Sequence, residues 1–370
     1  MESAKNTAMM DLYILNRIAL SCGNSKNFTA AYNFVLLRDY CLVFEEIVNA
    51  FEPHIQLNKN VKKIRQNIKL FGKRGSLKND DIYLKIRKVH EESFASYENN
   101  IGLYLDGERI IGSTVYNTFI FLDSEFENPY LTMYDSEFKE KLRIFFMETM
   151  LETRMELEPH ILNDENIEFY KNIPILKTDI SREVRCFDVR AEKFFEDEKN
   201  SLTYQTLQFR LLICLQELNY MIHIYKIFIE NTTKKFSDEY TFMRVLTRGL
   251  DSILKNINNL FEYSNDEFIQ WTNTMDEENK CRIQELAKNK EMILWTKKYR
   301  DMIHYDTRNE NSNFLDVMTI DDEFKHKCYE VYDEVVVPLQ KSISEFFIVT
   351  ESHRFSFLKM LMMKLGQAET

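Results

Sequence analysis

The residues best suited to chemistry lie close together in the last quarter of the chain. Arg300, Asp301 and His304 all fall within the stretch 295–306. Arg300 and His304 are four positions apart, so on a helix their side chains lie on the same face. A fixed guanidinium cation beside an imidazole that exchanges a proton near neutral pH suits catalysis on a phosphodiester. These three residues are therefore the candidate catalytic residues.

A second candidate is a basic stretch, residues 59–78, which contains no acidic residue. Apolar residues at 61, 64, 68 and 71 recur at helical spacing, which predicts an amphipathic helix with a cationic outer face. The candidate nucleic-acid contacts on it are Lys62, Lys63, Arg65, Lys69, Lys73 and Arg74. Two interpretations stay open: a surface that contacts phosphates, or an ordinary solvated helix that balances acidic neighbours.

The composition predicts a mainly α-helical fold. Only 8 Gly and 5 Pro occur among 370 residues, well below the usual shares of about 7% and about 5%, so tight turns are few. The net charge of −11 means that nucleic acid would have to bind at a local basic patch. The six cysteines form no Cys-x-x-Cys pair, and we interpret them as reduced, buried thiols of a cytoplasmic protein.

Several common chemistries have no counterpart in the sequence. It contains no Gly-x-x-x-x-Gly-Lys loop, no Gly-x-Gly-x-x-Gly and no His-Glu-x-x-His. The remaining histidines are scattered without the spacing of metal ligands, so we expect neither a metal nor a cofactor. No basic and apolar leader opens the sequence, and no apolar run reaches the length of a transmembrane segment.

Before about Asn200, the pattern predicts an N-terminal helical domain with a small β element. Helices are expected at 7–22, 29–51, 59–78, 79–99 and 136–157. Residues 101–122 are rich in β-branched and aromatic side chains, and Asp106-Gly107 predicts a two-residue hairpin turn. A further strand is expected at 114–121, and residues 158–200 are expected to be irregular, with short helical pieces.

After Asn200, four long amphipathic segments predict an antiparallel helical bundle. They span about 202–230, 237–262, 276–301 and 321–343, with a loop at 305–318 and a kink at Pro338. A Met-rich amphipathic tail follows at 355–365. The bundle places the Arg300 motif at the end of its third helix.

A helical bundle whose third helix ends in Arg300, a polar residue and then His304 resembles the HEPN (higher eukaryotes and prokaryotes nucleotide-binding) superfamily. The likeness covers residues 204–350, and the motif has one residue fewer between Arg300 and His304 than the family usually has. The resemblance implies a metal-independent ribonuclease of toxin or antiphage-defence type, which dimerises around its motifs. It implies that Arg300 holds the scissile phosphate and that His304 exchanges a proton with the RNA. For Asp301 it leaves two roles open: to position the arginine or to contact the other protomer.

Two simpler interpretations stay beside this one. Arg300 could pair with Glu291 or Asp301 at the surface, while His304 merely ends the helix. The protein could then be a non-catalytic interaction subunit of a defence or regulatory complex. RNA, a homodimer and a hetero-complex are the partners that these interpretations predict.

Overall fold

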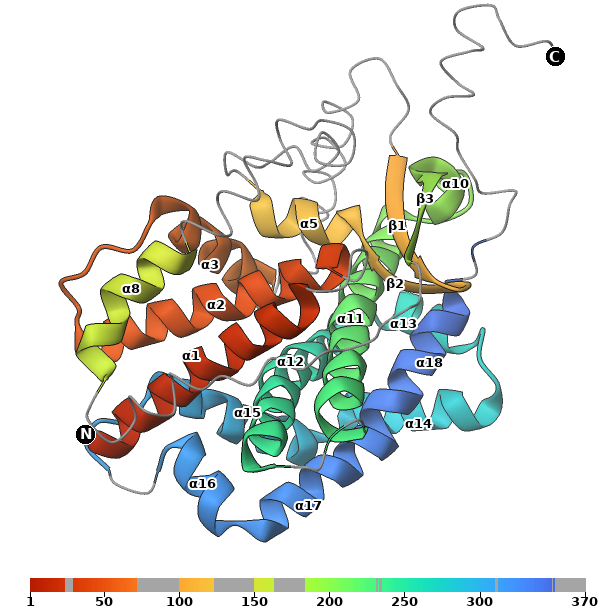
Figure 1. Cartoon of the computed structure of the whole chain (residues 1–370). Coiled ribbons are helices and arrows are strands. Elements are labelled where there is room, and N and C mark those ends of the chain that lie inside the picture. Colours follow the sequence, from red (N-terminus) through yellow and green to blue (C-terminus); the bar gives the residue numbers. More distant parts are fainter. Residues whose placement is uncertain are drawn as a thin grey trace, which may run out of the picture.

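The computed structural model confirms a mainly α-helical fold with one small sheet. It describes residues 1–23, 29–71, 100–122, 150–162, 184–230, 232, 235–309, 312–347 and 349. Figure 1 shows two long helices at the centre, with N-terminal helices on one side and C-terminal helices below and on the other side. Among the described helices, none combines the length and the apolar character that a bilayer-spanning segment requires.

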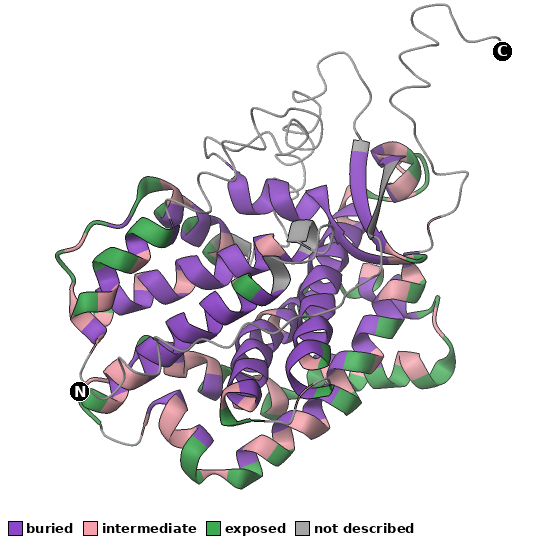
Figure 2. Ribbon diagram, in the orientation of Figure 1, coloured by how far each residue is buried: buried purple, intermediate pink, exposed green. Residues whose placement is uncertain are grey.

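The central helix is α11, Leu202–Tyr225, which the π-helical turn η2, Lys226–Glu230, continues. It begins at Ser201, whose side chain accepts a hydrogen bond from the backbone N–H of Tyr204 and so caps the helix. Every residue from Tyr204 to Ile224 is buried, and Figure 2 shows the helix purple along most of its length. A helix that is buried on all sides belongs to the core of a large fold rather than to one face of a bundle.

Polar side chains of α11 tie the surrounding elements together. The Oε1 atom of Gln216 accepts a hydrogen bond from the backbone N–H of Ser113 at 3.0 Å. Asn219 donates from Nδ2 to the backbone oxygen of Ile110 at 3.1 Å and accepts from Gln340 at 3.1 Å. Because a buried polar group is costly without a partner, these contacts fix the sheet and the last helix against α11.

The N-terminal helices are α1 (Glu2–Gly23), α2 (Thr29–Phe51), α3 (Lys59–Phe71) and α8 (Met150–Ile161). Each of α1, α3 and α8 packs on α2. The predicted helices at 7–22 and 29–51 are confirmed, and the basic helix is confirmed as far as Phe71. The remainder of the basic stretch, the predicted helix at 79–99, the segment 136–149 and the tail 355–365 lie outside the described residues.

The sheet has three antiparallel strands in the order β2-β1-β3. The predicted hairpin is confirmed, but its two turn residues are Gly107, at φ 67°, and Glu108, one position later than predicted. They connect β1 (Asn100–Asp106) to β2 (Arg109–Ser113). The third strand, β3 (Val184–Arg190), pairs with β1 along its whole length and leads into the short helix α10 (Ala191–Phe195). The expectation of an irregular chain with short helical pieces at 158–200 was therefore wrong for the strand β3, whereas the short helix α10 agrees with it.

The predicted strand at 114–121 was also wrong, because these residues form the helix α5, Thr114–Phe121. All eight are buried, so no polar face reveals the helical period. The helix end is stabilised from elsewhere: Asn67 on α3 donates to the backbone oxygens of Ile120 and Leu122 at 3.1 and 2.8 Å. Free carbonyls at a helix end need such partners, and this partner is remote in sequence.

The C-terminal half follows the four predicted helical segments, with additional breaks. Its elements are α12 (Phe236–Tyr263), α13 (Asn265–Thr272), α14 (Glu277–Lys288), α15 (Lys290–Asp301), η3 (Met302–His304), α16 (Phe314–Ile320), α17 (Asp322–Val331), η4 (Tyr332–Val336) and α18 (Val337–Phe346). The predicted third helix breaks at Asn289, whose side chain caps α15. A π-helical turn precedes Pro338. The expected loop at 305–318 is partly wrong, because Asn313 and Asp316 form a capping box that begins α16.

Buried ion pairs join the two halves of the chain. Arg244 on α12 binds Asp11 on α1 at 2.7 Å, and both side chains are fully buried. Arg17 binds Asp238 at 2.5 Å, and Arg38 on α2 binds Glu217 on α11. The two-domain division near Asn200 stays a prediction, but these contacts show that the halves share one interior.

The cysteines are only partly as expected. Cys41, Cys214 and Cys328 are buried free thiols, whereas Cys281 on α14 is exposed. Burial raises the pKa of Cys41 to about 12, so this thiol stays protonated and inert. The prediction of a buried thiol was wrong for Cys281, which lies on the outer face of its helix. The side chains of Cys22 and Cys186 lie outside the described residues.

Candidate active site

The three candidate catalytic residues lie where α15 ends, but not on one continuous helix. Arg300 and Asp301 are the last residues of α15, and His304 is the last residue of the 3₁₀ turn η3. The side chain of Arg300 is 34% exposed and that of His304 is 55% exposed. Both groups are therefore open to solvent, and neither is enclosed by packed side chains.

Arg300 is held by two carboxylates. Its Nε donates to Asp251 on α12 at 3.1 Å, and its Nη1 donates to the neighbouring Asp301 at 2.9 Å. The predicted pairing with Asp301 is confirmed, and Asp251 takes the place that was expected for Glu291. Lys255, one turn after Asp251, binds the same carboxylate at 2.7 Å. Among the residues that the structure describes, none accepts a hydrogen bond from Nη2 of Arg300.

His304 has a partner that sequence reasoning missed. Its Nδ1 lies 2.7 Å from Oε2 of Glu46 on α2, and the side chain of Glu46 is only 8% exposed. The hydrogen bond to Glu46 raises the pKa of His304 above its ordinary value, which outweighs the lowering by partial burial and by Arg300. The local signal for Glu46 was a pair of adjacent acids, Glu45 and Glu46, late in α2, where the helix dipole disfavours negative charge.

The next residue, Tyr305, holds the turn that contains His304 against the core. Tyr305 adopts a left-handed backbone conformation, with φ 41° and ψ 83°, which is uncommon for a residue other than glycine. Its hydroxyl donates to Asp11 at 2.9 Å, and its buried ring stacks on Phe51 at 6.0 Å between centroids. The buried ion pair of Asp11 and Arg244 thus anchors the turn that presents His304 to solvent.

The cluster consists of Glu46, Asp251, Lys255, Arg300, Asp301 and His304. Its two fixed cations and three carboxylates give a net charge of −1 with a neutral His304, and protonation of His304 makes the sum zero. An anionic substrate would therefore meet the least repulsion when the imidazole is charged. The chemistry available is proton transfer at His304 beside the guanidinium of Arg300.

The predicted nucleic-acid contacts on α3 are not equivalent. Lys62 is exposed and Lys63 is half-buried. Arg65 is buried and donates to Glu45 at 2.9 Å, and the exposed Lys69 binds the same carboxylate at 2.9 Å. Lys73 and Arg74 lie outside the described residues. Buried and paired, Arg65 adds little to a cationic surface.

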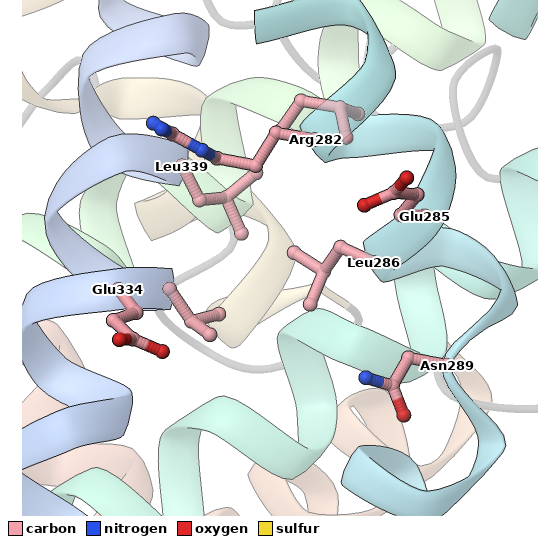
Figure 3. A pocket seen from close by; sticks show the side chains of 8 residues that line it. Arg282, Glu285, Leu286, Asn289, Glu334 and Leu339 are labelled. Carbon is pink, nitrogen blue, oxygen red and sulfur yellow. The ribbon is translucent and has the colours of Figure 1, made fainter. Parts of the chain in front are cut away.

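Two further observations bear on binding. In the described part of the chain, no group of three or more His, Cys, Asp or Glu side chains is placed to hold a metal ion. A pocket of about 140 Å³ lies between α14 and the helix formed by η4 and α18, with residues such as Leu286 and Leu339 in its wall and Glu285 and Glu334 near its edge (Figure 3). It contains no residue of the Arg300–His304 cluster, and it is smaller than the roughly 300 Å³ at which ligand pockets usually begin.

Comparison with known proteins adds no further constraint. No protein-family model matches the chain, and neither a curated protein nor a solved structure matches it significantly. The resemblance of the motif to HEPN proteins therefore stays a prediction.

Proposed function

We propose that this protein is a metal-independent ribonuclease that acts on RNA in the cytoplasm, with Arg300 and His304 as its catalytic residues. The observation that carries the proposal is a solvent-exposed imidazole with its Nδ1 held by a carboxylate at 2.7 Å, beside a partly exposed arginine. A carboxylate-supported histidine next to a fixed cation suits general acid–base chemistry on a phosphodiester.

In the proposed reaction, Nη2 of Arg300 binds a non-bridging phosphate oxygen. Neutral His304 takes the proton from the 2′-hydroxyl, and the resulting 2′ oxygen attacks the adjacent phosphorus. The P–O5′ bond breaks, giving a 2′,3′-cyclic phosphate and a 5′-oxygen that receives a proton from water or from an imidazolium. Asp301 positions the guanidinium of Arg300, which is one of the two roles that the resemblance leaves open. Lys62 and Lys69 on α3 are the proposed further contacts to the RNA backbone.

The test is cleavage of end-labelled RNA in the presence of a chelator. We expect the wild-type protein to release fragments with 2′,3′-cyclic phosphate and 5′-hydroxyl ends. Substitutions His304→Ala and Arg300→Ala should each lower the rate by about 10²–10⁴-fold, the usual contribution of a general acid or base. Cleavage should increase as pH rises through the pKa of His304, which lies above the ordinary 6.5.

Matched controls are the exposed His326 on α17 and the exposed Arg282 on α14, which lie outside the cluster. Substitution of either by Ala should leave the rate unchanged. Equal cleavage by all five proteins would identify a contaminating nuclease, and no cleavage by the wild-type protein between about pH 5 and pH 9 would end the proposal.

A second candidate function is a non-catalytic interaction subunit, which one observation favours: the cations Arg300 and Lys255 are already paired with carboxylates. The HEPN resemblance also implies a dimer.

Light scattering on the purified protein measures its mass, and a monomer that does not cleave RNA would contradict both the dimer and the nuclease. A stable dimer or hetero-complex unaffected by Arg300→Ala and His304→Ala, without cleavage, would support the interaction subunit.

A further inference from the structure

The contact between Glu46 and His304 joins two residues that are far apart in the sequence. The two residues are 258 positions apart, and one comes from each half. The 2.7 Å separation of Oε2 and Nδ1 is that of a short, charge-assisted hydrogen bond. Glu46 is almost fully buried, whereas more than half of the His304 side chain is exposed. One end of the imidazole is therefore fixed in the protein and the other faces solvent.

This geometry decides which ring nitrogen can exchange a proton. When the carboxylate of Glu46 is ionised it only accepts hydrogen bonds, and the Nδ1 atom of His304 then carries the proton that it donates to Glu46. In the neutral ring, Nε2 is then the unprotonated nitrogen. Nε2 is therefore the atom that takes up and releases a proton, and the Nδ1–H group is a fixed donor.

The other charged groups near His304 cannot replace Glu46. Asp301 at the end of α15 raises the pKa of His304 less than Glu46 does, and its carboxylate is bound to Arg300. Arg300 lowers the pKa of His304. Asp251 on α12 is bound by both Arg300 and Lys255. Among these groups, Glu46 alone contacts the imidazole directly.

We propose that Glu46 is the positioning residue of the site: it orients the imidazole of His304 and keeps Nε2 as the nitrogen that exchanges a proton with the 2′-hydroxyl of RNA. The catalytic part of this inference rests on the proposed ribonuclease function. In this proposal, the N-terminal half of the chain contributes Glu46 on α2 to the site, and the C-terminal half contributes the other residues.

The chain offers a matched control in the preceding residue. Glu45 lies on the same helix, but its carboxylate binds Arg65 and Lys69 on α3. Consecutive helical residues point about 100° apart, so Glu45 and Glu46 serve α3 and η3 separately. Substitutions Glu45→Gln and Glu46→Gln remove the same charge from adjacent positions, and only the second removes the partner of His304.

The experiment records the ring nitrogen resonances of His304 in full-length ¹⁵N-histidine-labelled protein as pH is varied, with His304→Gln to assign them. In the wild-type protein, neutral His304 should be protonated at Nδ1. In Glu46→Gln the pKa of His304 should fall and the Nδ1–H form should lose its predominance. Glu45→Gln should match the wild-type protein in both. Glu46→Asp retains the charge but is one methylene shorter, so the pKa should recover in part.

Kinetics add a readout that mere structural damage would not produce. If RNA is cleaved, Glu46→Gln should lower kcat by at least about tenfold, less than the loss of His304 itself. It should also move the acid limb of the pH–rate profile to lower pH, while KM stays near the wild-type value. Thermal unfolding of each variant confirms that it is folded at the assay temperature.

The outcomes separate the two proposals. An unchanged tautomer and pKa of His304 in both folded Glu46 variants would overturn the role of Glu46, even if His304 proves essential for cleavage. Absence of cleavage by the wild-type protein would end the ribonuclease proposal and with it the catalytic role of Glu46. The resonances would still show whether Glu46 sets the protonated nitrogen.

Discussion

At the scale of single residues, the Glu46–His304 pair makes stability depend on pH in a defined direction. The pKa of His304 is raised in the folded protein, chiefly by the hydrogen bond to Glu46. The folded state therefore binds this proton more tightly than the unfolded state does. The stabilisation is fully present below the unfolded pKa near 6.5 and is lost as pH rises through the higher folded value.

We therefore predict that Glu46→Gln lowers the free energy of unfolding more at about pH 5.5 than at about pH 8.5. The difference should be small and should shrink in salt, because more than half of the His304 side chain is exposed. Denaturant titrations at the two pH values measure it.

Glu45→Gln is the control, because the pKa of Glu45 is lowered in the folded protein, whereas that of His304 is raised. Burial raises the pKa of Glu45, but its contacts with Lys69 and Arg65 outweigh burial and leave the pKa below the ordinary 4.5. Its stabilisation is fully present at both pH values, so its effect should not differ between them. An equal effect of Glu46→Gln at both pH values would contradict the assignment.

At the scale of elements, the end of α15 depends on a buried polar cluster beneath it. Asp11 on α1 accepts hydrogen bonds from Arg244 at 2.9 and 2.7 Å, from Tyr240 at 3.1 Å and from Tyr305 at 2.9 Å. The guanidinium of Arg244 also lies over the ring of Phe314, 4.4 Å from its centroid. One carboxylate thus holds together α1, α12, the turn after η3 and the start of α16.

We predict that Asp11→Asn lowers the free energy of unfolding by roughly 3–5 kcal/mol, because it leaves the fully buried Arg244 without its counter-charge. The milder Tyr305→Phe removes one hydrogen bond to the carboxylate of Asp11 and should cost about 1.5–3 kcal/mol. Urea or guanidinium unfolding measures both.

The control is the exposed pair of Arg282 and Glu278, whose side chains are 43% and 81% exposed. Glu278→Gln should change the stability by less than about 1 kcal/mol. Should Asp11→Asn cost no more than Glu278→Gln, the cluster would not anchor these elements.

At the scale of the whole molecule, the two halves depend on each other for their charge balance. Arg244, Asp238 and Glu217 in the second half have buried partners in the first half. Arg248 lies 3.3 Å from Asp39 and is equally buried. A fragment without the first half would expose the surface of α11 and leave these charges unpaired.

We predict that residues 201–349 alone do not fold cooperatively, and that the full chain unfolds in one transition. Circular dichroism and calorimetry measure both. Co-expression of residues 1–200 with this fragment should restore the transition. A sharp independent transition of the fragment would instead establish the two-domain division predicted near Asn200.

The local sequence pattern was enough to predict those elements of the fold that are determined within one segment of the chain. Scarce Gly and Pro and the three-four apolar spacing indicate the long helices, and Asp106-Gly107 indicates the hairpin. Arg300, Asp301 and His304 were found because they lie within one turn of each other. Each of these features depends on residues that are close together in the sequence.

Contacts between remote segments decided the rest. Asn67 stabilises the end of α5 where β-branched residues suggest a strand, and β3 exists because it pairs with β1. Glu46 reaches His304 only when α2 packs against η3. The local sequence around a residue does not specify which distant helix will pack against it. Burial and long-range pairing arise only when the whole chain packs.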